Sequence, residues 1–173
     1  MIELGRTYRH PRNGVEVTVL RDDPDGYEIA IMQPGRIAHS RPHVHTDFDQ
    51  AFVVDEGTAQ VRVGRTRHVL TAGERLDLPR GTMHVDAWNE GAEPLRFRNV
   101  ITPTPRFIPA YVDAVVTRLA DGTLPDNQEI PVLQLAVIHQ ATDGQSFGPG
   151  PIAPQRALLP LLAAIGRRRG YQS

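Results

Sequence analysis

The chain has 173 residues, of which 40% are hydrophobic and 23% charged, and its formal net charge is -1. This length favours one domain with a buried core, and the near-neutral charge gives no electrostatic basis for binding nucleic acid or an anionic membrane surface. All 19 basic residues are arginine and cysteine is absent, which excludes a lysine Schiff base, a thiol nucleophile and a cysteine-bound metal.

The chain carries no long apolar segment. Residues 1–6 lack the apolar stretch of a secretory signal, and the longest apolar run, near 158–165, is interrupted by Pro160. A helix that spans a membrane needs about 20 apolar residues. We therefore expect a soluble, cytoplasmic protein.

Residues 1 to about 102 have the pattern of short β-strands. Apolar and polar residues alternate with a period of two, and clusters of Gly, Pro and Asp separate the alternating segments. Short strands divided by regular turns predict a β-sandwich or barrel. The strands are expected near residues 15–19, 27–31, 50–54, 59–63, 68–70, 75–78, 84–88 and 95–101.

The apolar period becomes helical in the remainder, residues 103–173. Tyr111, Val115 and Leu119 lie four residues apart, which predicts an amphipathic helix, and Gly122 is suited to end it. This part of the chain is therefore expected to form a helical extension.

Two more helices are expected within the extension. One begins with Pro131 as its first helical residue. The other spans about 155–169, where Pro160 either bends the helix or marks its start. Between them, residues 143–154 are rich in Gly and Pro and predict a loop.

Two histidines, His43 and His45, stand two residues apart in an extended segment. Alternate residues of a strand point the same way, so both imidazoles can face one point. Imidazoles combined with an oxygen ligand suit divalent transition metals. By the same alternation Gln50 should point inward and Asp49 away, although Asp49 and Asp47 remain alternative sources of an anionic oxygen.

This segment resembles the first motif of the cupin superfamily. That motif runs His-x-His, three or four residues, Glu, six residues, Gly. Here it reads His43, His45, Gln50 and Gly57, so the main departure is glutamine in place of glutamate.

A second segment resembles the second cupin motif, which runs Gly, five residues, Pro-x-Gly, two residues, His, three residues, Asn. The matching residues are Gly73, Pro79, Gly81 and His84, and the asparagine position holds Trp88. The two motifs together cover about a quarter of the chain, in the right order and among predicted strands.

The resemblance implies a mainly β fold, with a cupin barrel of jelly-roll type over residues 1–102. The C-terminal α-helical extension over 103–173 would then pack on the barrel or on a partner subunit. Cupins are often dimers, so the resemblance also implies a homodimer.

The resemblance further implies one divalent transition metal, Fe, Mn, Ni or Zn. The metal would be held by His43, His45, His84 and the residue at the glutamate position, Gln50. Because an amide is neutral, this ligand set would leave the site near +2, which favours anionic ligands. His10, His39, His68 and His139 lie outside the motifs.

The function implied is that of a mononuclear metal-binding cupin acting on a small organic molecule, as a dioxygenase, isomerase, cyclase or lyase. Asp86 and Gln50 are the catalytic candidates, although Asp86 also suits a polar position at the barrel mouth. Phe52 and Trp88 have the parity of pocket-facing residues and are candidates for substrate binding. The alternative is a non-catalytic cupin that binds a small molecule or an anion.

Overall fold

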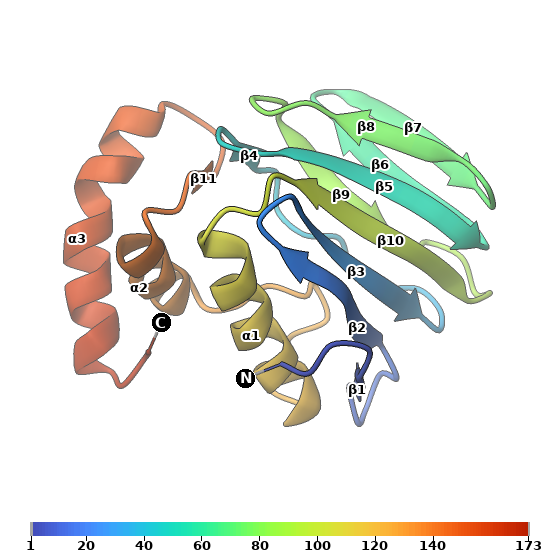
Figure 1. Cartoon of the computed structure of the whole chain (residues 1–173), viewed down its shortest axis with the longest axis horizontal. Coiled ribbons are helices and arrows are strands. Elements are labelled where there is room, and N and C mark those ends of the chain that lie inside the picture. The colour runs from blue at the N-terminus through green and yellow to red at the C-terminus, as the bar shows by residue number, and fades with distance from the viewer. Residues whose placement is uncertain (1, 173) are drawn as a thin grey trace.

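The computed structural model describes residues 2–172 and places a β-barrel beside three helices, with α3 outermost (Figure 1). The strands are β1 (Thr7–Arg9), β2 (Glu16–Asp23), β3 (Gly26–Gln33), β4 (Val44–His45), β5 (Asp49–Glu56), β6 (Thr58–Val63), β7 (Thr66–Thr71), β8 (Arg75–Leu78), β9 (His84–Trp88), β10 (Leu95–Thr102) and β11 (Ser146–Phe147). The helices are α1 (Phe107–Ala120), α2 (Val132–Thr142) and α3 (Ile152–Arg168).

The strands form two main sheets, as the alternating pattern predicts. The larger has the order β1-β2-β3-β10-β5-β8, and the smaller has the order β7-β6-β9. A short third sheet pairs β11 with β4. The pairings in both main sheets are antiparallel. Because these sheets make up most of residues 1–102, the prediction of a mainly β fold is confirmed.

The inward faces of the two main sheets share one apolar cluster. Phe52 and Val54 of β5 contribute to it together with Val61 of β6 and Phe97 of β10. Their alternation along β5 also buries Gln50, which is 5% exposed. Strand parity therefore places the Gln50 side chain on the face that points into the barrel.

Helix α1 covers the sheet at strands β2 and β3 (Figure 1). Its buried residues Val112, Val116 and Leu119 belong to the same apolar cluster as Val17 and Ile29 of those strands. The extension consequently packs on the barrel of its own chain and shares a core with it. The helix ends at Ala120 with Asp121 as its C-cap, and Gly122, whose φ is +74°, follows as the C′ residue, as expected.

The structure corrects three details of the predicted extension. Pro131 is the N-cap of α2, with extended ψ, and is not its first helical residue. Helix α3 begins at Ile152, so Pro160 lies inside it and does not mark its start. Its ring removes one backbone hydrogen bond without ending the helix. The predicted loop 143–154 contains the short strand β11.

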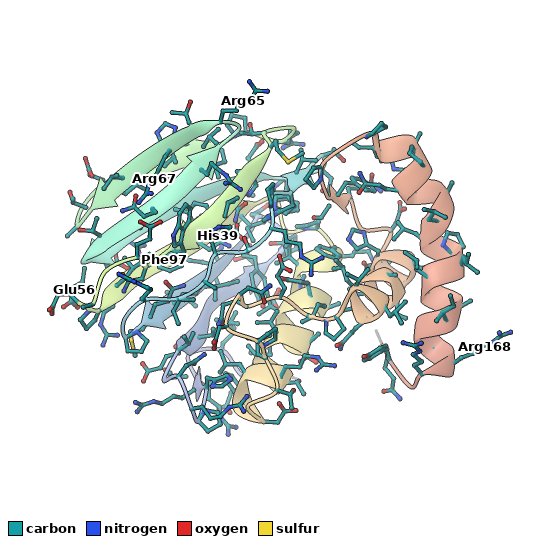
Figure 2. All side chains as sticks on the ribbon, turned by 180° about the vertical axis from the view of Figure 1, so that it is seen from behind. His39, Glu56, Arg65, Arg67, Phe97 and Arg168 are labelled. Atoms are coloured by element: carbon teal, nitrogen blue, oxygen red, sulfur yellow. The ribbon has the colours of Figure 1, made fainter. Side chains whose placement is uncertain are left out.

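The outer helix stands at the opposite end of the molecule from the β6–β7 hairpin. Figure 2 shows Arg65 and Arg67 at the hairpin end and Arg168 at the exposed C-terminal end of α3. Within residues 2–172, none of the helices has the length and apolar character needed to cross a membrane.

Substitutions of Gly57 and Gly73 can test how the motif glycines support the barrel. Both have positive φ, +83° and +88°, but a Cβ on Gly57 would clash with the Pro94 carbonyl, whereas a Cβ on Gly73 would meet nothing within 4 Å. We expect Gly73→Ala to lower the free energy of unfolding by about 1–2 kcal/mol through backbone strain alone. Gly57→Ala should cost roughly 1 kcal/mol more, because overpacking adds to the strain. Urea denaturation measures both, and equal losses would contradict the close approach.

Candidate metal centre

Three histidines from two segments of the barrel meet at one point. His45 lies in β4 and His84 begins β9, while His43 forms an isolated antiparallel bridge with His84. Two backbone hydrogen bonds of 2.9 Å join His43 and His84, each donated by the N–H of one to the carbonyl of the other. One ring nitrogen from each of the three histidines lies within 4.8 Å of the others.

Backbone carbonyls fix the rings of His43 and His84. The Nδ1 atom of His43 lies 2.9 Å from the Arg41 carbonyl oxygen, and that of His84 lies 2.9 Å from the Thr82 carbonyl oxygen. A carbonyl only accepts, so each Nδ1 carries a proton, and in the neutral ring Nε2 keeps its lone pair. This is the tautomer that metal-bound histidine adopts when its second nitrogen is held by an acceptor.

The extension fixes the ring of His45. Ser146 of β11 places its hydroxyl oxygen 2.6 Å from His45 Nδ1, across the pairing of β11 with β4. The ring also stacks on Phe48, with 4.2 Å between centroids. All three histidines therefore have a hydrogen-bonded Nδ1, and within residues 2–172 their Nε2 atoms make no hydrogen bond.

The protonation and burial of these rings fit a metal ion. Burial lowers the pKa of His45 well below its usual value, and the neighbouring His43 and His84 lower it further. Nε2 of His84 is buried and has no hydrogen-bond partner among the described residues. A buried nitrogen of this kind, beside two others, fits a metal that takes neutral imidazole ligands. A set of three imidazole ligands does not itself choose among Fe, Mn, Ni and Zn.

Asp86 lies directly against this point, on the same face of β9 as His84. One of its carboxylate oxygens, Oδ1, is 3.6 Å from Nε2 of His43 and 3.6 Å from Nε2 of His84. Burial alone would raise the pKa of Asp86, but the imidazoles of His43, His84 and His45 outweigh it and keep the pKa below the usual range. The same carboxylate raises the pKa of His84 against the effect of burial.

Gln50 reaches the site through Asp86. Its Nε2 donates hydrogen bonds to Oδ1 of Asp86 at 3.3 Å and to Oδ1 of Asn99 at 3.0 Å, and its own Oε1 is buried without a partner among the described residues. Asp49 points outward and binds Arg80, as strand alternation predicts.

Asp47, the other carboxylate considered as an oxygen ligand, lines neither of the two cavities beside the site. Burial raises its pKa.

A cavity of about 430 Å³ opens from the histidines toward the helices. His43, His45 and Asp86 lie on its barrel side, and apolar residues of all three helices form the opposite wall. Arg41 and Glu129 border it and form an ion pair of 2.8 Å that ties the segment before β4 to the α1–α2 connection. Its apolar wall includes Phe48, Ile101, Ile108, Leu135, Leu159 and Leu162.

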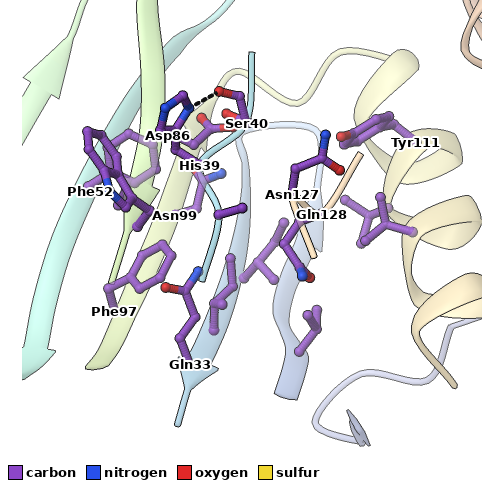
Figure 3. Close-up of a pocket in the computed structure, with 18 residues that line it drawn as sticks. Gln33, His39, Ser40, Phe52, Asp86, Phe97, Asn99, Tyr111, Asn127 and Gln128 are labelled. Carbon is purple, nitrogen blue, oxygen red and sulfur yellow. Dashed lines mark hydrogen bonds between the residues drawn. The ribbon is translucent and has the colours of Figure 1, made fainter. Parts of the chain in front are cut away.

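A smaller cavity of about 130 Å³ lies between the barrel strands and α1, and both predicted substrate-binding residues, Phe52 and Trp88, line it. Figure 3 shows it between Phe52 on the barrel side and Tyr111 on α1. Asp86 lines both cavities, whereas Phe52 and Trp88 line only the smaller one.

His139 belongs to the larger cavity, although the sequence motifs leave it out. It projects from α2, is 3% exposed, and its Nδ1 has no hydrogen-bond partner among the described residues. Burial lowers its pKa, so it is neutral at neutral pH. Ser146 and Asn99 were also missed, because both act through hydrogen bonds to other residues of the site.

The Cupin domain family model matches residues 28–101, which include both motifs and all three clustered histidines. The match and the fold together show that this chain contains a cupin domain. No match was found among curated protein sequences.

Solved structures share the fold at low sequence identity. KdgF from Halomonas sp. is 19% identical, with a TM-score of 0.51 over 62% of this chain and 97% of that one. TT1209 from Thermus thermophilus is 24% identical, with a TM-score of 0.50 over 61% and 98%. An RmlC-like cupin from Shewanella frigidimarina is 22% identical, with a TM-score of 0.48 over 60% and 90%.

Ser146 gives a test of how the extension supports the metal centre. Ser146→Ala removes the partner of His45 Nδ1, and loss of such an outer hydrogen bond typically weakens metal binding about 10–100-fold. We expect a Ni²⁺ affinity lowered by at least about tenfold, measured by isothermal titration calorimetry.

The matched control is Thr142→Ala, which removes a hydroxyl of the same extension that binds only the Ile138 carbonyl. Unchanged Ni²⁺ affinity in Ser146→Ala, or an equal loss in the control, would contradict the positioning role.

Proposed function

We propose that this protein is a mononuclear metal-dependent cupin that binds and transforms a small organic molecule in the cavity between barrel and helices. The main supporting observation is that ring nitrogens of His43, His45 and His84 meet at one point, that each Nδ1 is held by a hydrogen bond, and that His43 and His45 line that cavity. The metal would supply a Lewis acid for the polar end of the ligand and, if it is redox-active, a centre for oxygen chemistry.

The cavity indicates the kind of ligand. Most of its wall is apolar, which suits the body of a small organic molecule, and polar groups gather at the histidine end. A ligand with oxygen atoms at one end would place them toward the metal and its apolar part against α1, α2 and α3. His139 stands in the same wall as a neutral hydrogen-bonding group for such a ligand.

Two polar groups that line the cavity, Asp86 and His139, favour catalysis over simple binding. Asp86 is ionised and faces the histidines, and His139 is neutral with a free nitrogen among the described residues. A neutral imidazole moves protons in isomerases, cyclases and lyases, and an ionised carboxylate beside the histidines balances the charge of the metal. The proposed reaction is therefore that of an isomerase, a cyclase, a lyase or a dioxygenase. A homodimer remains a prediction.

Metal binding is tested by loading the purified protein. We expect one Zn²⁺ or Ni²⁺ per chain after dialysis, measured by mass spectrometry of the metal content. At a free metal concentration 100-fold above Kd, the bound ion should stabilise the fold by about 2.7 kcal/mol. His84→Ala should lose the ion and this stabilisation.

The control is His68→Ala, because His68 lies in β7 and lines neither cavity. A wild-type protein that retains no metal and shows no metal-dependent shift in thermal unfolding would rule out the proposed function.

Cavity occupancy is tested with 2-naphthoate, an apolar aromatic body with a carboxylate. Leu135→Trp fills part of the cavity, so we expect it to weaken naphthoate binding to the metal-loaded protein about tenfold, or about 1.4 kcal/mol. Metal content should not change. Val69→Trp is the control, because Val69 is exposed on β7. Equal naphthoate affinity in wild type and Leu135→Trp would show that the ligand lies elsewhere.

A further inference from the structure

Glutamine at the position where the cupin motif has glutamate leaves that position without an anionic oxygen. The structure places a carboxylate at the same point from another strand. Asp86 Oδ1 lies 3.6 Å from Nε2 of both His43 and His84. Ligand atoms that share one metal stand about this far apart, because each metal–ligand bond is roughly 2.0–2.2 Å long.

The carboxylate is held in place like a ligand. Gln50 Nε2 donates to Oδ1 of Asp86 at 3.3 Å, and Ser40 Oγ donates to Oδ2 at 3.4 Å. Gln50 is itself fixed by its second hydrogen bond, to Asn99. Hydrogen bonds of this kind orient ligating carboxylates in metal sites.

We infer that Asp86 is the anionic fourth ligand of the metal and that Gln50 is its positioning residue. The carboxylate is thus supplied by Asp86 of β9 instead of by a glutamate of β5. The amide of Gln50 donates a hydrogen bond to it. A carboxylate at both positions would set two negative charges about one hydrogen bond apart, so glutamine at 50 and aspartate at 86 depend on each other.

This assignment rests on the proposed metal site and changes its charge. With Asp86 bound, the centre carries a net charge near +1, as it would with glutamate at position 50. The site is then no strong trap for anions, and its open positions favour ligands that coordinate through neutral or singly charged oxygen. Asp86 lines both cavities, so its position also sets how far a ligand can extend from the helices into the barrel.

The test is an exchange of the two side chains, read out by Co²⁺ titration of the full chain. Asp86→Asn should weaken Co²⁺ binding about 10–100-fold and alter the visible absorption bands of the saturated complex. The double variant Gln50→Glu/Asp86→Asn returns a carboxylate to the site and should recover affinity to within about threefold of wild type, or about 0.6 kcal/mol.

Asp77→Asn is the matched control, because it removes an exposed carboxylate of β8 that binds Arg75. Thermal unfolding in a chelator shows whether each variant folds. If Asp86→Asn binds Co²⁺ with wild-type affinity and spectrum, Asp86 is not a ligand, although the metal site itself would stand. If the double variant still binds Co²⁺ weakly, the exchange of roles between positions 50 and 86 is wrong. A wild-type protein that binds no Co²⁺ would overturn the proposed function, and this inference with it.

Discussion

The centre of this molecule depends on a simple constraint on three imidazole rings. Each ring has one nitrogen engaged at the barrel wall, by the carbonyls of Arg41 and Thr82 and by the hydroxyl of Ser146. The other nitrogens must then face a shared space. Without these hydrogen bonds the histidines would be free to rotate and to change tautomer, and a metal would have to order them on binding.

The helical extension takes part in this arrangement at three levels. Helix α1 completes the core over β2 and β3, and all three helices wall the larger cavity. Strand β11 pairs with β4 and brings Ser146 to His45. A cupin barrel alone would leave the histidine end open to solvent and one ligand without its partner. The extension is therefore part of the site as well as part of the fold.

Much of this could be predicted from the sequence. Alternation along the strands predicted the inward Gln50 and the outward Asp49, and two spaced motifs predicted the meeting of His43, His45 and His84. The same alternation places Asp86 on the face of His84. Local pattern is enough wherever a strand is long and half-buried.

The missed features depend on contacts between distant parts of the chain. A strand of two residues such as β11 has no periodicity of its own, so neither it nor the role of Ser146 could be found. Helical spacing alone does not show that His139 lines the cavity, because its position depends on how α2 packs in the folded chain. Phe52 and Trp88 have the right parity, but the cavity beside the histidines is shaped by the helices, and these two residues line the smaller one.

The most direct test of the metal centre is anomalous X-ray diffraction from crystals of the protein soaked in Zn²⁺. We expect one dominant peak, about 2.0–2.1 Å from Nε2 of His43, His45 and His84, with an oxygen of Asp86 completing the protein ligands. A strong peak held by other residues, or rings of these histidines turned so that Nδ1 faces the metal, would contradict it.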